Sequence, residues 1–317
     1  MEKIKSALFA KIETVYGTDP IPIAATDAIE AYDQPSFELV TDPKARTVPI
    51  STFGELAPLI LGKSYKLGGI KVPLKGSGTA GTAPRVAPLL RALGFAQTIT
   101  AGISVAYALH STLEGESCTL YFWFGGTKHI LTGCVGSGKL SLQAGEVMFL
   151  ECDFTGIYGG VISDITFPSP TFETTAQQIW DTALFKFTPA AGSDLGLVVS
   201  KFDIDLGNEV NSQPDANSIS GIRRYFISDR KTKVSLDPEK VALSSLNPYT
   251  LHENQTLIAI ETKPTGTAGN LVEILVGGVS LDAPKNGNRN NVATWDLSGQ
   301  CRPTIAVGNN EISITFK

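Results

Sequence analysis

The chain has 317 residues, which at roughly 100–200 residues per domain is enough for two domains, each able to bury a core. Charged residues make up only 18% of the chain, and such chains often hide surface against other subunits, although an ordinary secreted or viral β-protein has a similar composition. The net charge of −5 argues against a protein that grips nucleic acid, because such proteins need Lys and Arg to neutralise phosphates.

The first 35 residues have the pattern of an arm. Pro20, Pro22 and Pro35 interrupt the segment, and residues 17–20 read Gly-Thr-Asp-Pro, which is a turn signal. A short helix or strand is expected around residues 4–13, with too few apolar side chains to form a core. We therefore expect residues 1–35 to stay outside the main body, either free or docked on a neighbouring subunit.

Beyond the arm, alternating apolar and polar residues predict antiparallel strands. Residues 120–124 and 128–132 flank Gly125-Gly126 and predict a hairpin with a two-residue turn. Residues 139–142 and 148–154 alternate in the same way on either side of Ala144-Gly145. Each of these strands is therefore expected to bury one face.

One segment, residues 84–94, has helical spacing. Apolar side chains recur there at i, i+3, i+4 and i+7: Val86, Leu89, Leu90 and Leu93. Pro84 suits a first turn and Gly94 suits a C-terminal cap. A helix this short is expected to pack on a sheet.

Residues 159–192 are rich in Gly and Pro and predict a connector, with a brief helical stretch at residues 176–180. After the connector, Phe202, Ile204 and Leu206 alternate with polar residues and predict a strand. Residues 312–316 alternate in the same way, so the chain is expected to end on a strand.

The sequences on the two sides of this connector resemble each other. Residues 37–39, 71–74, 140–144 and 153–156 have counterparts, in the same order, at residues 202–204, 233–236, 279–283 and 296–299. A second helix is expected to begin at Asp237, with Pro238 in its first turn. We infer an internal duplication with domains at residues 36–158 and 193–317. The alternative is that β-proteins share such strand and turn patterns by chance.

No residue pattern indicates a catalytic, cofactor-binding or metal site. Residues 76–81 fit G-x-G-x-x-G, but no acidic residue follows about 20 residues on and no parallel-sheet pattern surrounds them, so we interpret them as a loop. His110, His129 and His252 lack metal-ligand spacing, and His129 is expected on the polar face of its strand.

The cysteine spacing and the lengths of the apolar runs indicate the cellular compartment in which the protein is made. Cys118, Cys134, Cys152 and Cys301 lack C-x-x-C spacing and are interpreted as small core residues. The apolar run near the start is too short for a signal peptide, and no stretch approaches the ~18 apolar residues of a membrane helix. The protein is expected to be soluble and made in a reducing cytosol.

Several segments together resemble one family. They are residues 8–20, 75–84, 89–95, 131–133, 204–208, 227–231 and 310–317. As a set they are similar to the tail tube proteins, or major tail proteins, of long-tailed bacteriophages. The resemblance covers nearly the whole chain, and residues 45–69 and 209–221 match less well.

The resemblance implies a mainly β fold of two tandem tail-tube β-sandwich or barrel domains, each with a short flanking α-helix. It implies a structural virion protein and not an enzyme. Its rings stack into a hollow conduit for phage DNA ejection, and a duplicated chain forms rings of three with pseudo-six-fold symmetry.

The resemblance also implies partners and a location. The partners are further copies of the chain, the tape measure protein, the tail terminator and distal tail or baseplate proteins, with non-specific passage of double-stranded DNA. Neither a cofactor nor a membrane is implied. The protein is expected in the virion tail after assembly in the host bacterial cytoplasm.

An acidic lining would repel phosphates and let DNA slide through the tube. Asp203 and Asp205, on the polar face of an alternating strand, are candidates for this lining, with Glu38 at the equivalent place in the first half. The alternative is that they face solvent. Two other functions stay open at this point: a tandem β-sandwich that binds receptors or carbohydrates, which needs an exposed aromatic platform, and an enzyme, suggested only by the Gly-rich loop and scattered carboxylates.

Overall fold

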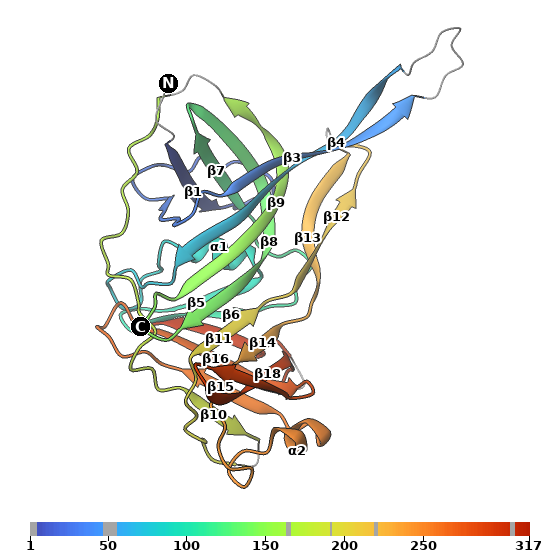
Figure 1. Cartoon of the computed structure of the whole chain (residues 1–317). Coiled ribbons are helices and arrows are strands. Elements are labelled where there is room, and N and C mark those ends of the chain that lie inside the picture. The colour runs from blue at the N-terminus through green and yellow to red at the C-terminus, as the bar shows by residue number, and fades with distance from the viewer. Residues whose placement is uncertain (1–4, 47–55, 163–165, 191, 219–220, 305–307) are drawn as a thin grey trace.

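The computed structural model describes residues 5–46, 56–162, 166–190, 192–218, 221–304 and 308–317 (Figure 1). Within these ranges the chain forms nineteen strands and two short helices. Every strand pairing is antiparallel, so the expectation of a mainly β fold is confirmed.

The elements divide between the two halves of the chain. The first half contains β1 (Ser6–Ile12), β2 (Ala28–Ile29), β3 (Ser36–Arg46), β4 (Leu56–Pro73), α1 (Ala87–Ala92), β5 (Phe95–Thr100), β6 (Ser104–Leu109), β7 (Cys118–Phe124), β8 (Thr127–Gln143) and β9 (Phe149–Ile162). The second half contains β10 (Lys186–Pro189), β11 (Lys201–Asp205), β12 (Asn208–Pro214), β13 (Ile222–Arg230), β14 (Lys233–Leu236), α2 (Pro248–Glu253), β15 (Ile258–Thr262), β16 (Val272–Leu281), β17 (Lys285–Arg289), β18 (Val292–Cys301) and β19 (Ile312–Phe316).

The same order of six strands occurs in each half. In the first half β3, β4, β9, β8, β7 and β1 are successive neighbours. In the second half β11, β14, β18, β16, β15 and β10 are successive neighbours. Cross-strand rows match as well: Phe37–Leu67–Phe154 in the first half and Phe202–Leu236–Leu297 in the second. These rows agree with the matches of residues 37–39 and 153–156 to the second half. The matches of residues 71–74 and 140–144 are wrong, because the rows set Leu236 against Leu67 and residue 140 against residue 288. The boundaries of the two domains stay a prediction.

Two pairings join the halves into one 17-stranded sheet. The last residues of β8, Lys139 to Gln143, pair with β11, and β6 pairs with the C-terminal strand β19. The first half therefore supplies a neighbour to the second half at two places. Closing a sheet in this way removes strand edges that would otherwise be left open.

Two β-hairpins rise from the body toward the same end of the molecule (Figure 1). One is formed by β3 and β4, whose outer part leaves the body, and the other by β12 and β13. They occupy matching places in the two halves, because β3 leads into β4 as β11 and β12 lead into β13 and β14.

One large hydrophobic cluster runs through both halves. The helix expected at residues 84–94 is confirmed as α1, and its side chains Leu89, Leu90 and Leu93 are fully buried in this cluster. Gly94 ends the helix with φ +92°, a conformation that favours glycine. All four cysteines are free and buried, as small core residues should be.

The Gly-rich loop brings the halves close together. The N–H of Gly76 donates to the side-chain oxygen of Asn270 at 2.9 Å, and the N–H of Gly78 donates to the carbonyl of Gly269 at 3.0 Å. A Cβ on Gly76 would lie 2.0 Å from the carbonyl oxygen of Gly269, so only glycine fits. The interpretation of residues 76–81 as a loop is confirmed.

The expectation that residues 1–35 stay outside the main body is wrong for part of that segment. Residues Leu8, Phe9 and Ala10 are at most 3% exposed, because β1 pairs with β7 inside the sheet. A strand needs few apolar residues when its neighbours supply the rest of the core. Residues 1–4 lie outside the described residues.

Two other helix expectations, at Asp237 and at residues 176–180, are wrong. The second helix begins at Pro248 with Asn247 as its cap, whereas the Asp237 carboxylate accepts hydrogen bonds from the N–H groups of Ser200 and Lys201. Residues 176–180, in the predicted connector, are not helical, and Ile179 forms a bridge with Val147. In both cases a distant strand satisfies the groups that a local helix would have satisfied.

Candidate functional site

One face of the continuous sheet is polar and crosses the junction between the halves. On β4, β9 and β8, Lys71 lies opposite Glu151, and Glu151 lies opposite Lys139. The ammonium of Lys71 is 3.5 Å from the carboxylate of Glu151. Across the junction Lys139 lies opposite Asp205, so charges of both signs alternate along this row.

Asp203 is the most buried charge on this face, with 5% of its surface exposed. Its carboxylate is 2.9 Å from the ammonium of Lys201 and 3.3 Å from that of Lys139, and it accepts a hydrogen bond from the Ser141 hydroxyl at 2.9 Å. Two lysines offset the desolvation of one carboxylate. Asp203 therefore acts as a tie between β8 and β11 and is not a freely solvated charge.

Asp205 and Glu38 are both exposed. The Asp205 carboxylate accepts a hydrogen bond from the N–H of Gly207 at 2.9 Å. Glu38 lies opposite Lys66 on the β3–β4 hairpin, in the row next to Phe37, as Asp203 lies in the row next to Phe202. The structure thus brings Asp203 and Asp205 together on one strand and sets Glu38 on the matching strand. Whether the three line a lumen stays a prediction.

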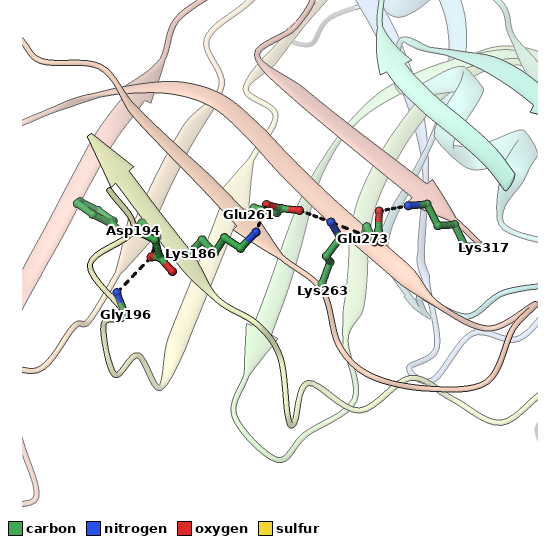
Figure 2. Close-up of polar contacts among 8 residues, drawn as sticks. Lys186, Asp194, Gly196, Glu261, Lys263, Glu273 and Lys317 are labelled. Carbon is green, nitrogen blue, oxygen red and sulfur yellow. Dashed lines mark hydrogen bonds and ion pairs between the residues drawn. The ribbon is translucent and has the colours of Figure 1, made fainter. Parts of the chain in front are cut away.

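The outer face of the β10–β15–β16–β19 region carries a ladder of alternating charges (Figure 2). Lys186 is 3.0 Å from Glu261, Glu261 contacts Lys263, and Glu273 is 3.8 Å from Lys263 and 2.6 Å from Lys317. A hydrogen bond from Lys263, aided by Lys186, lowers the pKa of the Glu261 carboxyl. These charges are satisfied within the chain, so this face offers little net charge to a partner.

A cavity of about 650 Å³ lies beneath the β12–β13 hairpin. Its ionisable groups contact one another: Arg230 is 3.3 Å from Glu311, and Arg224 is 3.2 Å from Glu114. Burial lowers the pKa of His110 at its wall. Among the described residues there is no cluster of three or more His, Cys, Asp or Glu that could hold a metal ion. These ion pairs join the elements that line the cavity.

The three tryptophan side chains and His129 pack within the fold. Trp123, Trp180 and Trp295 are each at most 5% exposed, so none of them forms an exposed platform for sugars. The expectation that His129 lies on a polar face is wrong. Its ring lies against that of Phe37, with centroids 3.9 Å apart and the planes tilted by 32°, because His129 points to the core side of its strand.

Sequence reasoning missed the heavily bonded carboxylate of Glu13. This residue is 9% exposed and accepts hydrogen bonds from the backbone N–H groups of Gly17 and Gly133 and from the hydroxyls of Ser117 and Thr119, all between 2.6 and 2.7 Å. The one sequence signal is its position, as an isolated acidic residue directly after an apolar strand. Three of its four donors, Ser117, Thr119 and Gly133, lie at or beside β7 and β8, so they fix the start of the chain there.

In the part of the chain that the structure describes, no helix is long and apolar enough to cross a membrane.

Comparison with known proteins identifies the family. A family model described as phage tail tube protein matches residues 4–316, nearly the whole chain. None of the curated proteins compared with the chain matches it. The extent of the family match, together with the mainly β fold, means that the chain belongs to the phage tail tube protein family.

Proposed function

We propose that the protein is the major tail tube subunit, whose rings of three chains have pseudo-six-fold symmetry and stack into the hollow conduit for DNA ejection. The observation that carries this proposal is the six-strand order that occurs twice and is joined by the β8–β11 pairing. Two equivalent sheet units in one chain let three chains supply six units. A head-to-tail contact that closes by rotation gives a ring without leaving strand edges.

The polar sheet face is the proposed lumen lining, with Glu38, Asp203 and Asp205 on it. The alternating row of Lys and acidic residues gives this face both signs of charge, and Lys139 and Lys201 largely neutralise Asp203. Asp205 and Glu38 are exposed and supply free negative charge. A face without a basic cluster binds phosphates weakly, so DNA can slide past it.

The proposed partners follow from this role. Further copies of the chain meet it within and between rings, and the two projecting hairpins are candidates for contacts between rings. The tape measure protein lies in the lumen, the tail terminator closes one end of the tube, and distal tail or baseplate proteins close the other. Assembly takes place in the host bacterial cytoplasm, and the role is structural, without catalysis.

Electron microscopy of the purified full-length chain tests the proposal. Concentrated protein, or protein given an initiator complex, should form hollow tubes with a regular axial repeat. End-on averages should show three-fold symmetry with six similar lobes. A chain that stays monomeric under both conditions would contradict the tube role, and rings of six chains would contradict the duplication.

A further inference from the structure

Two open strand edges lie at the ends of one ribbon of the sheet. The strands β3, β4, β9, β8, β11, β14, β18 and β17 are successive antiparallel neighbours. Within the described residues β3 pairs only with β4, and β17 pairs only with β18. Because the ribbon has an even number of strands, β17 of one chain is antiparallel to β3 of the next when the ribbons are placed side by side.

The internal β8–β11 junction gives a template for joining two such edges. Phe154 and Leu297 occupy matching rows on β9 and β18. Three residues before Phe154, Glu151 lies opposite Lys139, and Lys139 lies opposite Asp205 across the junction. The junction therefore has a defined register relative to the matching row.

The same steps in the second half lead to β17. Three residues before Leu297, Thr294 lies opposite Gly287 on β17. The counterpart of Asp205, three residues beyond Phe202, is Val40, three residues beyond Phe37. A copy of the internal junction thus sets Val40 of one chain opposite Gly287 of its neighbour.

We propose that β17 of one chain pairs antiparallel with β3 of the next chain in this register, with Glu38 opposite Arg289 and Asp42 opposite Lys285. The partner is a second copy of this chain, and the inference rests on the proposed tube function. In an antiparallel ladder, residues two steps from an opposed pair are also opposed, which fixes both charge pairs once Val40 and Gly287 are aligned.

Charge complementarity supports this register independently of the template. The β3 edge presents acidic Glu38 and Asp42, and the β17 edge presents basic Lys285 and Arg289, all on the polar face. Opposite charges directly across a strand pair stabilise it, whereas a two-residue slip would set Glu38 opposite Gly287. The side chains of Asp42 and its present partner Lys44 are each 59% exposed, so Asp42 is accessible to a neighbour.

Arg289 already has two acidic partners within the chain. Its guanidinium donates to the Asp237 carboxylate at 2.8 Å and to the Glu239 carboxylate at 2.6 Å. A guanidinium has five N–H donors, so these contacts leave donors for Glu38. Asp237 and Glu239 lie across β18 from β17, whereas Asp42 and Lys285 are both exposed, so the Asp42–Lys285 pair is the stronger of the two predicted contacts.

Prolines bound the proposed ladder on both strands. Pro43 follows Asp42 on β3, and Pro284 precedes Lys285 at the start of β17. In the proposed register these two prolines face each other. Since proline cannot donate to a ladder, pairing ends there on both sides.

Disulfide trapping in full-length protein tests the register. We expect the double variant Asp42→Cys, Lys285→Cys to give covalent dimers and trimers on mild oxidation of assembled protein, because directly opposed Cα atoms lie within disulfide range. Glu38→Cys with Arg289→Cys is the second in-register pair. Glu38→Cys with Lys285→Cys is the matched off-register control, since its positions are four residues, or roughly 13 Å, apart. The native cysteines are buried and do not compete.

A charge swap gives a second readout. Asp42→Lys or Lys285→Asp alone should raise by about fivefold the protein concentration at which tubes first appear, and the double swap should restore it to within about twofold. Both side chains are exposed, so neither change should disturb folding, which circular dichroism checks.

The outcomes separate this inference from the proposed function. Tubes that form while neither in-register pair cross-links, or in which the off-register pair cross-links instead, would overturn the edge pairing and leave the tube role standing. Cross-linked rings of three without tubes would support the pairing and count against stacking. Protein that neither assembles nor cross-links would overturn both.

Discussion

The hydroxyl of Tyr16 accepts a hydrogen bond from the backbone N–H of Tyr225 at 2.6 Å. The same hydroxyl donates to the carbonyl of Gly133 at 2.9 Å, so one side chain joins the start of the chain, β8 and the β12–β13 hairpin. Burial raises the pKa of Tyr16 well above its usual range, which keeps the hydroxyl protonated. Gly133 has φ +60°, and a Cβ there would lie 2.6 Å from the Tyr16 ring.

Tyr16→Phe should destabilise the chain by about 1–3 kcal/mol, because the Tyr225 N–H and the Gly133 carbonyl lose this partner in a partly buried place. Urea unfolding followed by circular dichroism measures the change. Tyr32→Phe is the control, since the ring of Tyr32 is about half exposed. Equal stability of the two variants would show that the hydroxyl bridge contributes nothing.

Glu13→Gln should destabilise the chain by about 2–3 kcal/mol, because an amide cannot accept all four hydrogen bonds that the carboxylate accepts. The change should also raise the rate at which protease cleaves near the start of the chain. Glu253→Gln, at an exposed position on α2, is the matched control. A Glu13→Gln variant that keeps the unfolding midpoint of the native chain would rule out this role.

Sequence patterns correctly predicted the elements that are formed by residues close together in the sequence. The hairpin of β7 and β8 turns at Gly125 and Gly126, both with positive φ, as the two-residue turn predicts. The helix α1 is also where its apolar spacing indicates. These elements depend on neighbours in sequence, so periodicity and turn chemistry identify them.

Sequence patterns could not predict which strands from distant parts of the chain pair with each other. The pairing of β6 with β19 joins residues about 200 positions apart, and neither strand carries a mark of its partner. Asp237, followed by Pro238, has the sequence pattern of a helix N-cap. In the structure its carboxylate instead accepts a hydrogen bond from the guanidinium of Arg289 at 2.8 Å, a partner that the local sequence does not indicate. The alternation of apolar and polar residues correctly predicted the strand that carries Asp203, one of the candidate lumen residues. It could not predict that Asp203 is buried, because the burial depends on an ion pair with Lys139 from the other half of the chain.

Asp203→Asn tests the tie between the halves. The change should destabilise the chain by about 1–2 kcal/mol, a value between those of exposed and buried ion pairs, because Lys139 and Lys201 are partly solvated. Asp205→Asn, two residues along the same strand, is the control and should stay within about 0.5 kcal/mol. Urea unfolding at low and high salt measures both. If the Asp203 variant changed no more than the control, the ion pairs would not hold β8 to β11.

His129 makes folding stability depend on pH. Burial lowers the pKa of His129 below its usual 6.5, because its ring lies against Phe37, Phe122 and Tyr65. The unfolded chain then binds a proton more readily than the folded chain. Stability is unaffected by this residue well above pH 6.5, falls as the pH drops below that value, and levels off below the folded pKa.

His129→Phe should remove this part of the pH dependence, since it keeps an aromatic ring beside Phe37 and has no titratable group. The effect should be less than about 1 kcal/mol between pH 7.5 and pH 5, because the ring is only half-buried. Urea midpoints of the native chain and the variant at both pH values measure it. The native chain should lose more stability than the variant on acidification. Identical losses would mean that protonation of His129 is not coupled to folding.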